Sequence, residues 1–412
     1  MSFDRATISQ PILIQAIGRG LYQLGSAILL FYLPIVFVNY AGFTATQVGL
    51  AVGGGSIAGF IGNFVGGAMT DSKQLGRRGT LIGAALLSIT AAIITAFAQT
   101  LPLLLVANIF FGVGTGLYWT AADAAVMDVT TSEERQSAFS ILAVLDNVGL
   151  GLGTLGGAWL LKTIHPENQM FTVAAAVFGM MLLLFTIGVK ETRDQATAAE
   201  VVDGLTGWKT AVTDSRLITY LIVNTLFITY IALVNSNLPL YLINFQHIVE
   251  STVSNLFTFG YVGLGAVIQV PIIRLIAGLG YLQSLMISTV IWAIGFGLLA
   301  LWHPIDQNLI AALTTLIVFA IATVIYKPTS ATWIAELSPP SLRGAYTAIA
   351  YQCWAIGYFI GPIFGGWALD QPADVTHRFW LIVGLSGGVG LLVLQLLSQR
   401  QAKHDAITVE AD

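Results

Sequence analysis

Charge is scarce in this sequence of 412 residues. Asp, Glu, Lys and Arg together make up 9% of the chain, whereas hydrophobic residues make up 56%. Water-soluble domains normally carry about 25% charged residues, so an ordinary soluble globular protein is excluded. The formal net charge is −4, which argues against nucleic acid as a partner.

Cysteine and histidine are also scarce. The single cysteine, Cys353, has no second cysteine in the chain with which to form a disulfide. The five histidines fall in predicted outer loops or in the C-terminal tail, so they indicate no metal site. The sequence also lacks the phosphate-binding pattern GxxxxGK(S/T), so we do not expect ATP to drive the protein directly. We therefore predict no cofactor, no metal and no enzymatic activity.

Long apolar runs make up most of the chain. Runs of about 20 residues cross the apolar core of a bilayer as helices. The sequence contains them at 11–40, 47–70, 79–99, 101–127, 137–162, 169–190, 216–245, 252–276, 281–302, 307–336, 343–369 and 378–399. We predict an all-α membrane protein of twelve transmembrane helices, with six-helix bundles at 1–190 and 216–399, a linker at 191–215 and a tail at 400–412.

The distribution of Lys and Arg predicts the orientation, because cytoplasmic loops carry an excess of these residues. If both termini are cytoplasmic, only Lys162 and Arg378 lie outside, while Arg19 and Lys327 fall within spans. The other cations then lie inside: Arg5, Lys73, Arg77, Arg78, Arg135, Lys190, Arg193, Lys209, Arg216, Arg274, Arg343, Arg400 and Lys403. We therefore predict a multi-pass protein of the cell (inner) membrane, with its termini, linker and tail in the cytoplasm.

The second half of the sequence repeats the first after a shift of 208 residues. Asp128 then aligns with Glu336, and Tyr118 aligns with Tyr326. Glycines and a tryptophan also align: Gly149, Gly153, Gly157 and Trp159 meet Gly357, Gly361, Gly365 and Trp367. Because the shift covers an even number of spans, both halves insert the same way up. Parallel repeats of this kind occur in secondary transporters, whose substrate site lies near the membrane midplane between the halves.

Glycine is abundant inside the apolar runs. The chain has 43 glycines, and membrane helices use small residues to bring their backbones close together. The residues expected to pack helices in the fifth and eleventh spans are Gly149, Gly153, Gly157, Gly357, Gly361, Pro362 and Gly365.

The loop after the second span carries a distinctive motif. It reads GAMTDSKQLGRR from Gly67 to Arg78: a glycine, three residues, an aspartate and a basic cluster that ends in Gly-Arg-Arg. This loop resembles the signature loop of the major facilitator superfamily, and the resemblance covers essentially the whole chain. The stretch DVTTSEERQSAF from Asp128, the glycine-rich fifth span and TDSRLITYL in the seventh are similar to the twelve-helix drug:proton antiporter branch.

The chain departs from the family pattern at three points. Two extra residues separate Asp71 from Gly76 in the signature loop. Thr154 occupies the place of a proline in the fifth span, and the glycine-proline pattern GYFIGPIFGG lies in the eleventh span instead. Asn108 stands in the fourth span where the antiporter branch usually has an arginine.

The resemblance implies a gating latch on the cytoplasmic side. It would join Asp71, Arg77 and Arg78 with Asp128, which lies at the cytoplasmic end of the fourth span. Partly exposed ion pairs contribute about 0–1 kcal/mol each, so a network of several can hold a closed state and still part. The alternative is that the two arginines only follow the positive-inside rule.

Four charged residues lie within the predicted spans: Arg19, Asp123, Asp146 and Lys327. A charge inside the bilayer is unfavourable by several kcal/mol or more, so such residues usually face a cavity or a partner. By resemblance, Arg19, Asp123 and Lys327 lie on three of the four helices that line the cavity. Because the four charges sum to zero, they permit two ion pairs.

Each of these charges has a simpler interpretation. Arg19 is close enough to the headgroups to snorkel, and Asp123 is shallow enough to belong to the latch. Asp146 shares a helix face with Gly149 and Gly153, which is typical of a structural partner for a neighbouring cation. Lys327 precedes Pro328, which removes a backbone hydrogen bond next to the charge.

Aromatic and amide side chains complete a candidate binding surface. Tyr118 and Trp119 lie in the fourth span, Asn224 in the seventh and Tyr326 in the tenth. Trp119 and Asp123 are four residues apart and therefore share one helix face. An apolar, aromatic cavity with few polar groups suits amphipathic compounds, although any single aromatic side chain has packing as its alternative role.

These patterns favour a secondary active transporter that exports small amphipathic or drug-like molecules by alternating access. Protons are the expected coupling ion, with Asp123 or Asp146 as the proton-responsive group. One alternative is a uniporter or importer of an organic anion held by Arg19 and Lys327. Another is a facilitator of lipid movement or a non-transporting membrane sensor. The expected partners are a small-molecule substrate, protons and the lipid bilayer, and the expected oligomeric state is a monomer.

Overall fold

The computed structural model describes residues 9–192, 204–301, 308–339 and 342–411. These residues form α-helices, one 3-10 turn and one π-helical segment, and no strand occurs among them. The prediction of an all-α protein is therefore confirmed. The chain divides into two compact units, Met1–Ala198 and Ala199–Asp412.

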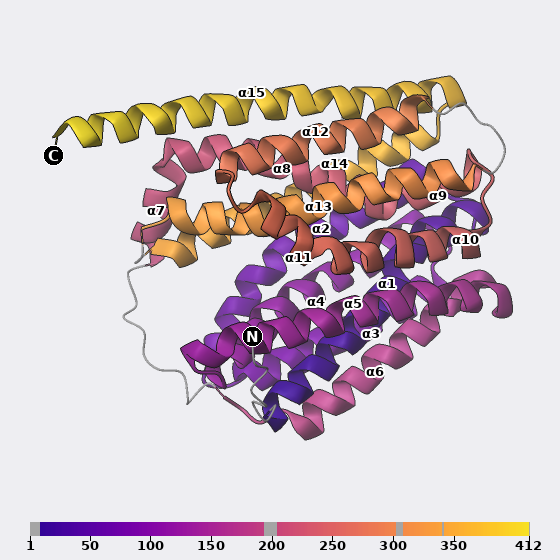
Figure 1. Ribbon diagram of the computed structural model, residues 1–412. Coiled ribbons are helices and arrows are strands. Elements are labelled where there is room, and N and C mark those ends of the chain that lie inside the picture. The colour runs from indigo at the N-terminus through magenta and orange to yellow at the C-terminus, as the bar shows by residue number, and fades with distance from the viewer. Residues whose placement is uncertain (1–8, 193–203, 302–307, 340–341, 412) are drawn as a thin grey trace. The chain divides into compact units, whose positions relative to one another are not determined.

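The first unit is a six-helix bundle (Figure 1). Its helices are α1 (Gln10–Asn39), α2 (Ala45–Asp71), α3 (Gly76–Phe97), α4 (Leu101–Asp128), α5 (Ser132–Thr163) and α6 (Phe171–Gly188). A short 3-10 turn, Glu167–Met170, leads into α6.

The second unit contains six further long apolar segments together with two short helices. Its elements are α7 (Gly204–Thr213), α8 (Ser215–Ser236), α9 (Leu238–Asn244), α10 (Glu250–Asn255), a π-helical segment (Leu256–Gly263), α11 (Leu264–Ile276), α12 (Tyr281–Leu301), α13 (Leu309–Leu337), α14 (Arg343–Leu369) and α15 (Ala373–Ala411). The stretch from α10 through α11 is continuous and forms one span.

Twelve helical segments in the described residues are long and apolar enough to cross a membrane, as the sequence predicts. Three details differ from the predicted boundaries. The seventh span is broken at Asn237, the linker contains the short helix α7, and the last helix continues through the predicted tail to Ala411.

Several helix starts follow directly from capping chemistry. Thr44 and Gln47 form a capping box at α2, and Thr131 and Glu134 form another at α5. In each box the threonine hydroxyl accepts a backbone N–H and the N3 side chain bonds back to the cap. Asp214 likewise accepts the backbone N–H of Arg216 at the start of α8. These caps fix where α2, α5 and α8 begin.

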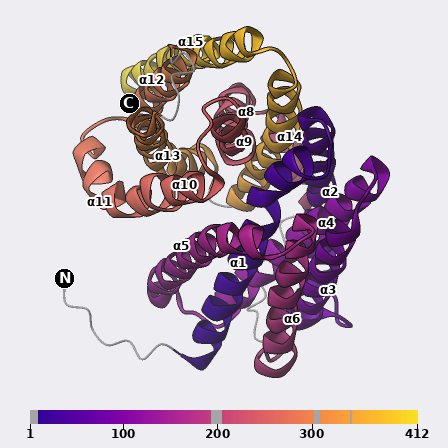
Figure 2. The same cartoon turned by 90° about the vertical axis from the view of Figure 1, so that its right-hand side faces the viewer.

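Helix packing within the first unit brings α1 alongside α5 and α6, and α4 alongside α2 and α3, as the view along the bundle shows (Figure 2). Glycine makes the α1–α5 contact close. A Cβ atom at Gly153 would lie only 2.5 Å from the carbonyl oxygen of Leu24 and 2.7 Å from the Cβ of Ala27, while one at Gly149 would overlap the backbone of Gly20. Any larger side chain at these positions would push the helices apart.

The second unit repeats this arrangement between α8 and α14. A Cβ atom at Gly357 would lie 2.7 Å from Cγ2 of Ile228, and one at Gly361 would lie 2.9 Å from the Cβ of Ala232. Pro362 accepts a hydrogen bond from Nδ2 of Asn237 through its carbonyl oxygen, at 3.5 Å. The glycine positions that align in the sequence repeat therefore meet equivalent neighbouring helices in both units.

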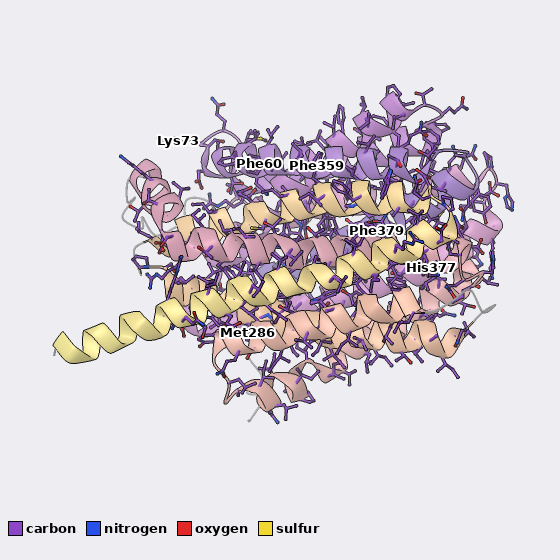
Figure 3. The ribbon with its side chains drawn as sticks, turned by 90° about the horizontal axis from the view of Figure 1, so that it is seen from above. Phe60, Lys73, Met286, Phe359, His377 and Phe379 are labelled. Carbon is purple, nitrogen blue, oxygen red and sulfur yellow. The ribbon has the colours of Figure 1, made fainter. Side chains whose placement is uncertain are left out.

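Large hydrophobic side chains are exposed along the spans, among them Phe64 on α2, Trp159 on α5 and Phe364 on α14. Lys73 extends from the loop between α2 and α3 (Figure 3).

Candidate functional site

A partly buried charge cluster joins three helices of the first unit. Nε of Arg19, on α1, donates to both carboxylate oxygens of Asp146 on α5, at 2.9 and 3.1 Å. Nη1 of Arg19 donates to Oδ1 of Asp123 on α4, at 2.9 Å. One guanidinium therefore bridges two carboxylates, and we call Arg19, Asp123 and Asp146 the charge triad.

Aromatic rings enclose the charge triad on one side. The guanidinium carbon of Arg19 lies 4.5 Å from the ring centroid of Trp119, a cation–π distance. Tyr22 stacks on Tyr118 with 3.8 Å between ring centroids, and Trp119 meets both rings edge-on. Tyr22 also donates its hydroxyl hydrogen to Oγ1 of Thr115, at 2.9 Å. The cation thus lies between carboxylates and an aromatic wall.

The charge triad changes three of the sequence interpretations. Both aspartates bind the same cation, so three of the four charges form one cluster and not the two ion pairs that the charges permit. Arg19 does not snorkel to the headgroups, because its guanidinium is paired and its side chain is 12% exposed. Asp123 belongs to this cluster and not to the latch. Lys327 lies on α13 of the second unit, where it is exposed.

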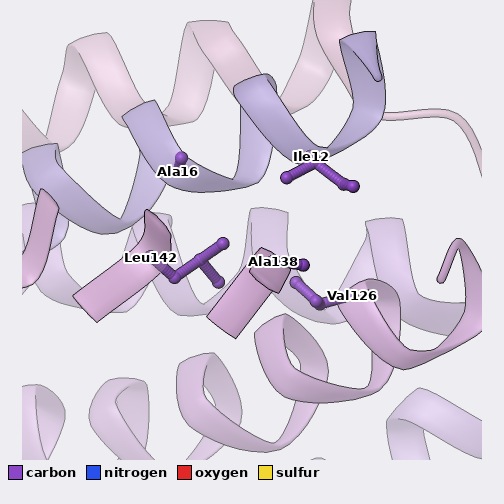
Figure 4. Close-up of a cluster of buried hydrophobic side chains, with 5 residues drawn as sticks. All are labelled: Ile12, Ala16, Val126, Ala138 and Leu142. Carbon is purple, nitrogen blue, oxygen red and sulfur yellow. The ribbon is translucent and has the colours of Figure 1, made fainter. Parts of the chain in front are cut away.

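A small apolar cluster packs beside the charge triad, one helical turn nearer the helix ends (Figure 4). It consists of Ile12 and Ala16 on α1, Val126 on α4, and Ala138 and Leu142 on α5. On each helix, these residues lie toward the end that carries Gln10, Asp128 or Ser132. The apolar cluster therefore separates the charge triad from that end of the bundle.

A second charge cluster lies at the junction of α2, α3 and α4. Arg77 donates from Nε to Oδ2 of Asp128, and from Nη1 to Oδ1 of Asp71, both at 2.9 Å. Nη1 also donates to the carbonyl oxygen of Thr70, at 2.7 Å. Asp71, Arg77 and Asp128, predicted as latch residues, are thus brought into direct contact.

Arg78, also predicted as a latch residue, bonds to α6. Its Nη2 donates to the carbonyl oxygen of Thr186 near the end of α6, at 2.6 Å. It therefore ties α3 to α6, and a latch role for Arg78 stays a prediction.

Glu191 is a member of this region that the sequence interpretation did not assign. Its two carboxylate oxygens accept the backbone N–H groups of Arg77 and Arg78, at 3.0 and 3.1 Å, at the start of α3. Gly76 permits this approach, because its φ is +60° and a Cβ there would overlap the carboxylate. The neighbouring Thr192 donates its hydroxyl hydrogen to Oδ2 of Asp128, at 3.0 Å. In the sequence, the position of Glu191 in the polar stretch directly after the sixth span was the feature that could have indicated this role.

The second unit holds a polar network without charge. Oδ1 of Asn224 accepts hydrogen bonds from the hydroxyls of Tyr326 and Ser330, at 2.7 and 3.1 Å, and Tyr220 donates to Ser330 at 2.7 Å. All four side chains are buried, and Tyr326 stacks on Phe227. Asn224 and Tyr326 therefore join α8 to α13 and do not lie on an open surface.

The charge triad has no counterpart in the second half of the chain. With the 208-residue shift of the repeat, Arg19, Asp123 and Asp146 align with Phe227, Ala331 and Trp354. The ionisable chemistry inside the spans is therefore concentrated in the first unit. Among the described residues, no group of three or more His, Cys, Asp or Glu side chains could hold a metal ion.

Twelve membrane helices, an internal six-helix repeat and a charge cluster inside the spans define a multi-pass membrane transporter. The sequence model described as Major Facilitator Superfamily matches residues 16–279 and 239–411. The chain belongs to that superfamily.

Curated relatives align over most of the chain. The multidrug resistance protein MdtH of Salmonella paratyphi B is 25% identical over 392 residues, which are 92% of each chain. The MdtH protein of Aeromonas hydrophila subsp. hydrophila is 25% identical over 397 residues, or 93% of each chain.

Solved structures share the fold at lower identity. The nucleoside transporter NupG superimposes with a TM-score of 0.82 at 14% identity, covering 94% of this chain and 99% of NupG. A D-xylose-proton symporter gives 0.75 at 17% identity, with coverage of 95% and 97%. At these identities the likeness shows the fold alone.

Proposed function

We propose that the chain is a proton-coupled exporter of small amphipathic molecules. The observation that supports this most directly is the charge triad, in which one guanidinium lies between two carboxylates inside the spans. With both carboxylates ionised the triad carries a net charge of −1. Because an unbalanced charge inside a membrane is unfavourable, the triad favours uptake of a proton or of a cationic group.

Alternating access gives this charge a role in coupling. A proton and a cationic or amphipathic substrate would compete for the same excess negative charge, so binding one would release the other. Of the three rings in the aromatic wall, Trp119 is partly exposed and supplies an apolar surface for a substrate of this kind, whereas Tyr22 and Tyr118 are buried and pack against it. The relatives named as multidrug resistance proteins support the same direction of transport.

The organic-anion carrier is less well supported. It requires Arg19 to bind the substrate, yet both carboxylates already occupy this guanidinium. An anion arriving at the triad would meet a net negative charge. Repulsion at close range in a weakly screened setting is strong, so we favour cations and neutral amphipathic molecules as substrates.

The proposed setting is the cell (inner) membrane, with both termini and the linker in the cytoplasm. The excess of Lys and Arg in those segments supports this orientation. Both repeats of the transporter are present in one chain, which supports a monomer as the working unit.

Everted membrane vesicles test the proposal. In these vesicles an exporter accumulates substrate in the lumen, so we expect ethidium, an amphipathic cation, to accumulate when the lumen is acidic. Collapsing the pH gradient with an ionophore should abolish the accumulation. Fluorescein, an amphipathic anion, should not be concentrated.

Substitutions link this transport to the charge triad. Asp123→Asn and Asp146→Asn should each reduce gradient-driven accumulation of ethidium. Asp374→Asn, a matched change at an exposed carboxylate near the start of α15, should leave it unchanged. Gradient-driven accumulation that survives in both triad variants would rule out carboxylate coupling at this site.

A further inference from the structure

The two aspartates of the charge triad are not equivalent. We propose that Asp123 is the carboxylate that takes up and releases the proton, and that Asp146 remains ionised as the fixed counter-ion of Arg19. This inference deepens the proposed function and rests on it for its transport consequences. The protonation of Asp123 itself is a property of the resting protein and can be measured without transport.

The hydrogen bonds differ between the two carboxylates. Asp146 accepts from Nε of Arg19 through both oxygens, whereas Asp123 accepts from Nη1 through Oδ1 only. The side chain of Asp123 is 40% exposed, and that of Asp146 is 20% exposed. Asp123 therefore has the weaker hold on the cation and the more exposed carboxylate.

Helix packing also holds Asp146 more firmly against Arg19 than it holds Asp123. Asp146 lies one turn before Gly149, on the face of α5 that packs closely along α1. Backbone contact at Gly149 and Gly153 thus fixes the distance between Arg19 and Asp146. By contrast, α1 and α4 approach each other at only a few points, and they meet chiefly through side chains such as the stacked rings of Tyr22 and Tyr118. The link from Arg19 to Asp123 is the one that can part without unpacking the bundle.

The surroundings of Arg19 favour the same assignment. When Asp123 is protonated, Arg19 still holds Asp146 through Nε and still lies against the ring of Trp119. If Asp146 were the protonated group, Arg19 would keep a single hydrogen bond to a half-exposed partner. Loss of the best partner of a largely buried cation strongly destabilises a protein. Protonation of Asp123, with Asp146 ionised, is therefore the arrangement compatible with a stable protein.

Few other titratable groups act on Asp123. Arg19 faces it from α1 and Asp146 from α5, and the phenols of Tyr22 and Tyr118 lie in the same cluster. From α6, the cluster is covered by the rings of Phe178 and Phe185. Protonation of Asp123 brings the triad to zero net charge. Its return to the carboxylate releases the proton to water as the bond with Nη1 of Arg19 forms again, and no other bond changes.

Carbodiimide labelling tests the assignment on the full-length protein in detergent. Dicyclohexylcarbodiimide adds to protonated carboxyl groups in apolar surroundings, and peptide mass spectrometry locates the adduct. We expect the adduct on Asp123 to increase from alkaline to acidic pH, while Asp146 stays unlabelled over the same range. Preferential labelling of Asp146, or equal labelling of both with the same pH dependence, would overturn the proposal. So would the absence of label on both.

Proteoliposomes provide a second measurement. Asp123→Asn should lose ethidium accumulation driven by a pH gradient but keep ethidium counterflow, because its triad is permanently neutral. Asp146→Asn should lose both, because Asp123 then becomes the fixed partner of Arg19. The opposite pattern, with counterflow kept only in Asp146→Asn, contradicts the assignment.

The two proposals fail in different ways. If ethidium transport in the unsubstituted protein ignores the pH gradient while carbodiimide labels Asp123 and spares Asp146, the exporter proposal fails and the assignment stands. If transport is proton-driven but Asp146 carries the label, the assignment fails and the exporter proposal stands.

Discussion

Arg77 and Arg19 each bind two aspartates from different helices, but the partners differ in exposure. The carboxylate of Asp71 is 79% exposed, whereas that of Asp128 is 8% exposed. An exposed pair contributes little because water and salt screen it, while removal of a buried partner leaves a charge without compensation. The two bonds of Arg77 therefore have unequal energies.

Substitutions at Asp71 and Asp128 should separate gating from stability. Asp71→Asn should slow ethidium export and change the free energy of unfolding by no more than about 1 kcal/mol. Asp128→Asn should lower the free energy of unfolding by about 3 kcal/mol, because it removes the buried carboxylate that compensates the charge of Arg77. Thermal unfolding in detergent and initial export rates measure both effects. Wild-type export by a well-folded Asp71→Asn protein would remove Asp71 from the gate.

Glu191 should matter for the start of α3. Its carboxylate accepts two backbone N–H groups at the positive end of the helix, so Glu191→Gln should reduce stability by about 0.5–2 kcal/mol. The matched control is Lys190→Gln, the exposed neighbour, which should leave the unfolding temperature unchanged. Equal unfolding temperatures for the two variants would show that the cap contributes nothing measurable.

The individual site residues were predictable to different degrees. The signature loop singled out Asp71 and Arg77 because a local motif carries them, and Asp128 followed from a second motif at the end of the fourth span. The partners of Arg19 were not predictable, because they depend on how α1, α4 and α5 rotate about their axes, and sequence periodicity does not fix that rotation. The same limit applies to Asn224 and Tyr326, which were expected on a binding surface and are buried together instead.

At the scale of elements, α4 connects both charge clusters. It supplies Asp123 to the charge triad and Asp128 to the cluster at Arg77. The two aspartates are five residues apart, or about 7 Å along the helix axis. A movement of α4 relative to α1 and α3 would therefore act on both clusters at once.

Two substitutions on α5 test the close contact between α1 and α5. Gly153→Leu should destabilise the protein by at least about 1–3 kcal/mol, since its Cβ alone would lie 2.5 Å from a carbonyl oxygen of α1. Gly156→Leu is the matched control, because a Cβ at Gly156 meets nothing within 4 Å. Folded yield and monodispersity after extraction measure the difference. Equal yields for the two variants would contradict close packing at Gly153.

Span positions followed well from the sequence because each span is a long apolar run, and apolar length is set by the bilayer. Local breaks followed less well. The interruption at Asn237, with Pro239 two residues later, lies inside an apolar run, so hydropathy alone did not reveal it. The extension of α15 to Ala411 arose for the opposite reason: polar residues end a span but need not end a helix.

At the scale of the whole molecule, the predicted orientation is open to direct measurement. Lys209→Cys in the linker should react with a membrane-impermeant thiol reagent only from the cytoplasmic side, and Asp374→Cys only from outside. Both positions are exposed. The native Cys353 is buried, so the unsubstituted protein should give a low background from either side. Reversed labelling would invert the orientation and place the Arg77 cluster outside.

The two halves of the chain share glycine positions but differ in the charge triad. Both kept the glycines that bring paired helices together, but only the first carries the charge triad, with Phe227, Ala331 and Trp354 at the equivalent places in the second. Architecture and intramembrane charge are therefore separable features of the repeat. If the proposed coupling holds, a comparison of relatives at the glycine positions would follow the shared fold, whereas a comparison at the triad positions would separate proton-coupled relatives from the others.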